Sequence, residues 1–317
     1  MNDVRSAVTL RMPRVPALAR FAVAISGLTV LGHAFFGFEQ SYLHPVVGAL
    51  TAYVVEFVLE TLRARTQGAT PTYRGGGRQA AVFLLAPHIT GLTIAMLTYS
   101  NERMMPLVFT VAAAIASKYI FRVPVVEGGT RHFLNPSNFG IALTLTLIRS
   151  VGLAPPYQVT AQLSGVLDVL VPMALCVSGT FLNAAFTRKM PLILGWLVGF
   201  VVHAVARTLL FDANLSGILA PMTGPIFVLF TFFMVTDPGT TPTRAVPQLA
   251  FGFGVAMAYL LLMSVHVVFA LFYALVIVSC VRGAWMAYAA RRARQSDGEA
   301  QTAPCELRPA AEPVQAA

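Results

Sequence analysis

The sequence predicts an all-α, polytopic membrane protein, and three observations lead to this fold class. Of the 317 residues, 56% are hydrophobic and only 11% are charged. A soluble domain of this size would carry about 25% charged residues, so most of the surface has to face hydrocarbon. Apolar runs of about 20 residues, the length of a membrane-spanning helix, recur along the chain. The basic residues are concentrated in every second connection between these runs.

Ten apolar runs are long enough to be interpreted as membrane spans. They cover roughly residues 20–37, 43–62, 79–98, 104–121, 137–154, 163–183, 190–210, 217–236, 246–263 and 265–285. The boundary between the last two runs is only weakly marked. We expect residues 1–19 to form a cytoplasmic N-terminal segment. Residues 286–317 have no apolar period and are expected to form a disordered cytoplasmic tail.

The distribution of positive charge predicts the topology of these spans. With a cytoplasmic N-terminus, 19 of the 22 Lys and Arg residues fall on the inner side and only Arg103, Arg149 and Arg207 fall outside. Inner loops of membrane proteins are enriched in Lys and Arg, so both termini are expected to be cytoplasmic. The net charge of +9 then follows from topology, with the lipid bilayer as the expected partner and no nucleic acid implied.

An internal similarity predicts that the ten spans form two inverted five-helix repeats, covering about residues 20–154 and 163–285. Residues 85–91 (LAPHITG) resemble residues 219–224 (LAPMTG), five spans further on, although coincidence among common membrane residues is the alternative. An odd number of spans in each half gives the halves opposite orientations. The proline in each similar segment removes a helix hydrogen bond. Interrupted helices of this kind commonly build a small-molecule site between repeats.

A first polar string, HFLNPSNFG at residues 132–140, opens the fifth span. Pro136 disfavours helix at Asn135, so Asn135 is expected to be extended just before the span. Its side chain, together with the free amides of the first turn that carries Asn138, can face an electron-rich ligand. The alternative is that Asn135 simply caps the helix. His132 can donate or accept a hydrogen bond in the same place.

A second polar string, MVTDPGTTP at residues 234–242, ends the eighth span. Asp-Pro-Gly is a strong turn signal, so one interpretation is a plain helix stop. The functional interpretation makes Asp237 a hydrogen-bond acceptor for a ring imide or for ring hydroxyls. Thr236 and Thr240 would then contribute hydroxyl groups beside it.

The pair of strings, in this order and on this side of the membrane, resembles the RnfD/NqrB family. These proteins are the flavin-carrying membrane subunits of the Rnf complex and of the sodium-pumping NADH:quinone oxidoreductase. The resemblance covers roughly residues 20–285. It implies a non-covalently bound flavin, riboflavin or FMN, beside Asn135 and Asp237. His132, Asn138, Thr236 and Thr240 complete the cofactor-binding set that this resemblance implies.

The chain departs from that family in the loop that carries a second flavin. Relatives esterify FMN to the threonine of a Ser-x-Ala-Thr string after the fifth span, and residues 152–162 (GLAPPYQVTAQ) lack this string. Residues 67–70 (QGAT) look similar but fall on the opposite side of the membrane. Covalent FMN is therefore not expected. The departure makes the chain most similar to stand-alone relatives, such as those described as enediyne biosynthesis membrane proteins.

The resemblance implies a membrane electron-transfer protein, an oxidoreductase subunit of the bacterial inner membrane. It would pass electrons from a cytosolic donor toward a quinone or a periplasmic flavoprotein. Two alternatives stay open: a transporter or channel for a small polar solute, and an accessory membrane protein without a cofactor. His88 and His203 lack the paired spacing typical of haem ligands, and no metal site is expected. Glu56 is either a proton or cation relay or a partner in an interhelical hydrogen bond.

Overall fold

The structure, a computed structural model, describes residues 14–101, 103–125, 129–155 and 162–302. Helices make up most of this part of the chain, and its strands are short and paired in two antiparallel ribbons. Seven of the described helices are long and apolar enough to cross a membrane, and an eighth span is present if one bent helix pair is counted. The fold class expected from the sequence, an all-α membrane protein, is therefore confirmed.

The N-terminal part of the chain contains helices that follow the first five predicted spans. They are α1 (Arg14–Leu31) with the π-helical turn η1 (Gly32–Phe36), α2 (Leu43–Thr66), α3 (Gly77–Leu97), α4 (Met104–Ile120) and α5 (Pro136–Leu147). Between and after them lie β1 (Thr98–Tyr99), β2 (Arg122–Pro124), β3 (Thr130–His132) and β4 (Gly152–Leu153). Strand β1 pairs with β4, and β2 forms a hairpin with β3.

The C-terminal part is more irregular. It comprises α6 (Val166–Leu182) with the π-helical turn η2 (Asn183–Thr187), α7 (Met190–Phe211), α8 (Leu215–Leu219), η3 (Ala220–Thr223), α9 (Pro225–Leu229), the π-helical turn η4 (Phe230–Met234), α10 (Ala245–Ser264) and α11 (Ala270–Thr302).

The fifth predicted span, 137–154, is only partly helical. Helix α5 has 12 residues, so at about 1.5 Å per residue it is too short to cross hydrocarbon about 30 Å thick. The apolar residues beyond it enter a turn and then β4, where Val151 and Ala154 are buried against the core. Apolar runs alone do not distinguish a buried strand from the end of a helix, which explains the difference.

The eighth predicted span, 217–236, is broken. Its two halves, 215–222 and 226–234, meet at an angle of 62° around Gly224 and Pro225. Pro225 has no backbone N–H and begins the second half, as proline often does at a helix start. The corresponding interruption expected at Pro87 is wrong, because α3 continues through that proline.

The last helix is longer than predicted. The segment expected to be a disordered tail from residue 286 is helical as far as Thr302 in α11. Alanine, arginine and glutamine dominate its sequence, and all three are strong helix formers. Residues 1–13 and 303–317, which hold the rest of the predicted terminal segments, lie outside the described part of the chain.

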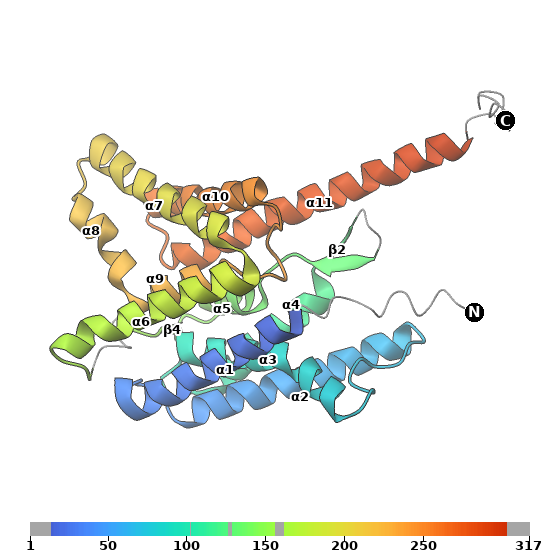
Figure 1. Ribbon diagram of the computed structural model, residues 1–317, viewed down its shortest axis with the longest axis horizontal. Helices are drawn as coiled ribbons and strands as arrows, with labels where there is room; N and C mark the ends of the chain where they lie inside the picture. Colours follow the sequence, from blue (N-terminus) through green and yellow to red (C-terminus); the bar gives the residue numbers. More distant parts are fainter. Residues whose placement is uncertain (1–13, 102, 126–128, 156–161, 303–317) are drawn as a thin grey trace, which may run out of the picture.

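The helices form two groups joined through α5 (Figure 1). In the first group α3 packs against α1, α2 and α4, and in the second α10 packs against α7 and α11. Helix α5 contacts α4 on one side and α11 on the other. The β2–β3 hairpin, the connection between α2 and α3, and the far end of α11 all lie at the same end of the molecule in Figure 1.

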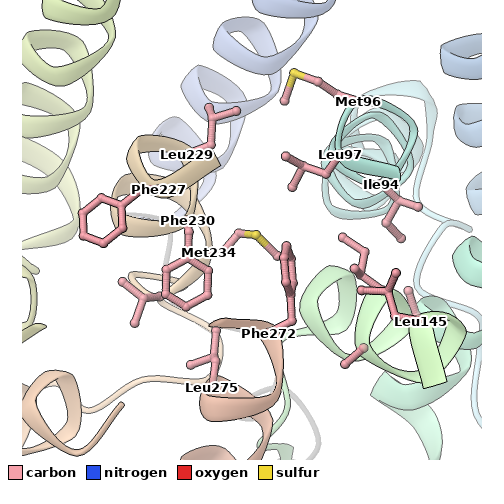
Figure 2. Close-up of a cluster of buried hydrophobic side chains, with 14 of the residues drawn as sticks. Ile94, Met96, Leu97, Leu145, Phe227, Leu229, Phe230, Met234, Phe272 and Leu275 are labelled. Atoms are coloured by element: carbon pink, nitrogen blue, oxygen red, sulfur yellow. The ribbon is translucent and has the colours of Figure 1, made fainter. Parts of the chain in front are cut away.

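The hydrophobic core lies where the two groups meet. Figure 2 shows side chains from α3, α5, η4 and α11 converging on one another. The buried members include Ile94, Leu97, Leu145, Phe230, Met234, Phe272 and Leu275. Because these residues come from both halves of the sequence, the core fixes the halves relative to each other.

Glycines allow α7 and α10 to pack with their backbones in close contact. A Cβ atom on Gly252 would lie 2.1 Å from the carbonyl oxygen of Leu192, and one on Gly195 would lie 2.2 Å from that of Leu249. Small residues at such crossings are typical of helix pairs in membranes, where van der Waals packing drives association.

Replacing Gly252 with alanine is therefore expected to lower the thermal midpoint of the detergent-solubilised protein. The added methyl group forces α10 away from α7, and overpacking of this kind costs about 1–3 kcal/mol. Gly254 in the same helix provides the control, because its Cβ would lie 3.8 Å from the nearest atom, in Val278. Gly254→Ala should leave the midpoint unchanged or raise it slightly. Equal midpoints for the two variants would contradict this account of the helix crossing.

Candidate functional site

The structure brings the two polar strings together at the junction of the two helix groups. The Asn135 amide Nδ2 donates a 3.0 Å hydrogen bond to the carbonyl oxygen of Met234, 99 residues away. Arg131 donates from Nε to the carbonyl oxygen of Gly239 at 2.7 Å and from Nη2 to that of Pro238 at 3.0 Å. We call this region, residues 131–138 together with 234–241, the junction site.

Asn135 acts as the N-cap of α5. Its backbone is extended, and its Oδ1 accepts hydrogen bonds from the backbone N–H of Asn138 at 3.0 Å and from the Ser137 hydroxyl at 2.9 Å. The following Pro136 occupies the first helical position. Both Asn135 polar atoms therefore bond to the protein itself. Its role in the structure is to order the junction site.

Asn138 has a buried oxygen without a partner. Its Nδ2 donates to the carbonyl oxygen of Phe272 in α11 at 2.9 Å, and the whole side chain is only 1% exposed. Its Oδ1 accepts no hydrogen bond from the described residues. A buried acceptor left in this state costs about 1–3 kcal/mol, so Asn138 marks a place that a donor group would stabilise.

Asp237 organises the turn after η4. Its Oδ1 accepts from the Gly239 backbone N–H at 2.9 Å, and its Oδ2 accepts from the Thr240 hydroxyl at 2.8 Å. The Thr236 hydroxyl donates instead to the carbonyl oxygen of Phe232 at 2.6 Å. Thr236 and Thr240 are buried, and each donates its hydroxyl proton to an acceptor three or four residues earlier in the chain. The helix-stop interpretation of this string therefore describes the observed geometry.

His132 closes the site from the β2–β3 hairpin. A Cβ on Gly239 would lie 3.3 Å from His132 Nε2 and 3.2 Å from Asp237 Oδ1, so the imidazole and the carboxylate face the same small space. Burial lowers the pKa of His132 below its ordinary value of 6.5, and the positive charges of Lys118, Arg122 and Arg131 act in the same direction. Asp237 opposes them. His132 is consequently neutral at pH 7.

Two arginines bind the backbone of the turn that carries Asp237. Besides Arg131, Arg282 of α11 donates from Nη1 to the carbonyl oxygen of Thr240 at 2.6 Å. The sequence indicates both arginines only as markers of the cytoplasmic side. Two signals in the sequence could have assigned them to the site: Arg282 interrupts the last apolar run, and Arg131 directly precedes His132.

The other residues singled out from the sequence have separate environments. Glu56 forms an ion pair with Lys118 and accepts from the Tyr119 hydroxyl at 3.0 Å, linking α2 to α4 as an interhelical bond would. His203 is buried against the rings of Phe200 and Tyr259. Among the described residues no three His, Cys, Asp or Glu side chains are grouped as metal ligands would be.

Two cavities lie elsewhere on the molecule. One of about 800 Å³ is an open cavity lined by residues of α1, α2 and α3, and one of about 400 Å³ lies between the end of α2 and the β2–β3 hairpin. Neither is lined by Asn135 or Asp237. In the junction site, the unpaired Asn138 oxygen can accept a hydrogen bond, and the neutral His132 imidazole can donate or accept one.

No family model matches this chain, and no curated protein matches it either.

Asn135→Ala is expected to destabilise the protein by about 1–3 kcal/mol, because the change removes both the helix cap and the bond to Met234. Asn135→Ser keeps a capping oxygen but has no amide to reach Met234. Its thermal midpoint should therefore lie between those of wild type and Asn135→Ala. A serine variant as stable as wild type would mean that the Asn135–Met234 bond does not hold the two strings together.

The lowered pKa of His132 predicts a pH dependence of stability. The folded protein binds this proton less readily than the unfolded chain, so the stabilisation is complete above the ordinary pKa of 6.5 and is lost as the pH falls below it. His132→Gln should lose less thermal stability than wild type on acidification. The exposed His266 in the α10–α11 connection provides the control, and His266→Asn should retain the wild-type loss.

Proposed function

We propose that this protein is a flavin-binding electron-transfer protein of the bacterial inner membrane, related to the RnfD/NqrB family. The observation that carries the proposal is the meeting of the two polar strings, which resemble that family's flavin-binding strings, around an unpaired buried acceptor and a group of cations. The flavin, riboflavin or FMN, would be held without a covalent bond. It would supply the redox chemistry, while the protein binds, orients and tunes it.

Each residue of the junction site then has a distinct role. Asn138 Oδ1 would accept a hydrogen bond from a bound flavin, and the neutral His132 would donate or accept a second one. Asn135 and Asp237 act as positioning residues, because their polar atoms hold the start of α5 and the turn after η4. The positive charges of Arg131 and Arg282 would stabilise added negative charge on the flavin and so raise its reduction potential.

The proposal includes ten segments arranged as two inverted repeats, of which the fifth would cross the membrane as helix α5 together with the non-helical residues that follow it. Two features support it. Helices α1 and α6, which open the proposed repeats, both end in a five-residue π-helical turn followed by a left-handed residue, Gly37 in one and Arg188 in the other. The second helix packs against the fourth in both halves, as α2 does against α4 and α7 does against α10.

In this topology both termini and the junction site face the cytoplasm, as the positive-inside distribution favours. A soluble cytosolic donor would reduce the flavin, and the electrons would pass to a quinone or to a periplasmic flavoprotein. The enediyne-type stand-alone relatives suggest a biosynthetic setting for such a pathway. Residues 156–161 of the external loop lie outside the described structure.

The direct test is the absorption spectrum of the purified protein. Wild type should be yellow or should take up riboflavin or FMN when it is reconstituted. Asp237→Asn and Asn135→Ser should each lower the flavin occupancy, because they loosen the site. Asp168→Asn, at the start of α6 and outside the junction site, is the control. Arg282→Gln should lower the flavin reduction potential, a readout that loss of folding alone would not produce. A colourless protein that takes up neither flavin would end this proposal.

A second candidate, a transporter or channel for a small polar solute, is favoured by the break in the eighth segment. Discontinuous helices frequently form the substrate site of transporters. The 62° bend at Gly224 and Pro225 is such a discontinuity. Solute uptake by liposomes containing flavin-free protein would support this candidate. A third candidate, an accessory protein without a cofactor, predicts that the Asn135 and Asp237 variants retain the cellular phenotype.

A further inference from the structure

The cavity of about 800 Å³ between α1, α2 and α3 shares no lining residue with the junction site. Its walls are mainly alanine, valine and leucine side chains of α1 and α3. Val23 and Val30 at its rim are 73% and 66% exposed, so the cavity opens onto an apolar face of the molecule. A face of this kind lies in hydrocarbon, and the molecules that reach the cavity are those that dissolve in the membrane.

Three polar side chains in the cavity wall form a hydrogen-bonded chain across three helices. The Ser26 hydroxyl of α1 lies 2.8 Å from Nε2 of His88 in α3. The Tyr53 hydroxyl of α2 lies 2.6 Å from Nδ1 of the same imidazole. Ser26 also donates to the carbonyl oxygen of Ala22 at 2.7 Å. All three side chains line the cavity.

One arrangement of the protons satisfies all three of these contacts. Ser26 has one hydroxyl proton and gives it to Ala22, so Ser26 accepts from His88 and the imidazole proton is on Nε2. A neutral imidazole carries a single N–H, so Nδ1 is an acceptor and Tyr53 donates to it. The phenolic oxygen of Tyr53 keeps an unused lone pair. Among the described residues, His88 is the only hydrogen-bond partner that Tyr53 has.

We propose that this cavity binds a membrane-soluble molecule that is apolar along most of its length and ends in a hydroxyl group, which donates to the Tyr53 oxygen. A bare acyl chain would leave this acceptor without a partner in hydrocarbon, which is unfavourable. Because Tyr53 already donates to His88, its oxygen is a stronger acceptor than that of an isolated phenol. The site is separate from the proposed flavin site and does not depend on it.

The experiment compares two probes, one of which can donate a hydrogen bond and one of which carries a methyl group in place of that proton. Full-length protein in detergent is titrated with para-dodecylphenol and with its methyl ether. Wild type should bind the phenol about five- to tenfold more tightly, the net effect of one hydrogen bond. Tyr53→Phe should remove this preference by weakening the phenol alone. Tyr259→Phe in α10, whose hydroxyl lies outside the cavity, is the matched control and should keep the preference.

A second variant tests the cavity without altering the hydrogen-bonded chain. Gly27 lines the cavity, and a Cβ placed on it would have no atom within 4 Å. Gly27→Leu should therefore fold normally, fill the space and weaken the binding of both probes at least tenfold. Equal affinities of phenol and ether for wild type would overturn the proposal. So would a preference for the phenol that persists in Tyr53→Phe, or unchanged binding of both probes by Gly27→Leu.

Discussion

In a membrane, a backbone carbonyl group that has no regular helical partner needs a hydrogen-bond donor from elsewhere in the protein. The broken eighth segment contains several such carbonyl groups. The turn η4 is π-helical and therefore wider than an α-helix. Side chains from other helices donate hydrogen bonds to its polar groups. Asn135 donates to the Met234 carbonyl and Asn183 of η2 donates to the Phe232 carbonyl at 2.9 Å. The Trp196 indole of α7 donates to the Thr231 hydroxyl at 2.9 Å. Both halves of the chain are therefore tied to one distorted turn.

Much of the fold could be predicted because an apolar run of about 20 residues has few alternatives in a membrane. The failures have physical causes. Val151 and Ala154 are apolar because they are buried beside strand β4. A high hydropathy indicates that a segment is buried, but it does not show that the segment is helical. The two similar segments differ in the residue that follows them: Gly91 is followed by Leu92 within the continuous helix α3, whereas Gly224 is followed by Pro225, where the chain bends. The similarity of the segments themselves therefore does not predict a break in both.

The candidate site was predictable in its location and in the bonds within each string, but not in the bonds between the two strings. Asn135 and Asp237 are noticeable in the sequence because each is a polar residue at the end of an apolar run. Each has a local interpretation and a ligand-binding interpretation. The local one, a cap and a turn, can be read from Pro136 and Pro238 because it involves neighbours in sequence. The group of Ser26, Tyr53 and His88 had no such signal. Its members come from three helices whose mutual rotation depends on packing, which the sequence does not encode locally.

The length of α11 has a mechanical consequence. Its 33 residues extend about 50 Å, whereas hydrocarbon is about 30 Å thick. The distal turns, which carry the exposed Arg291, Arg292 and Arg294, project past the other helices in Figure 1. A flexible tail would let these charges spread over the lipid headgroups. A continuous helix instead holds these charges at a fixed distance from the rest of the molecule.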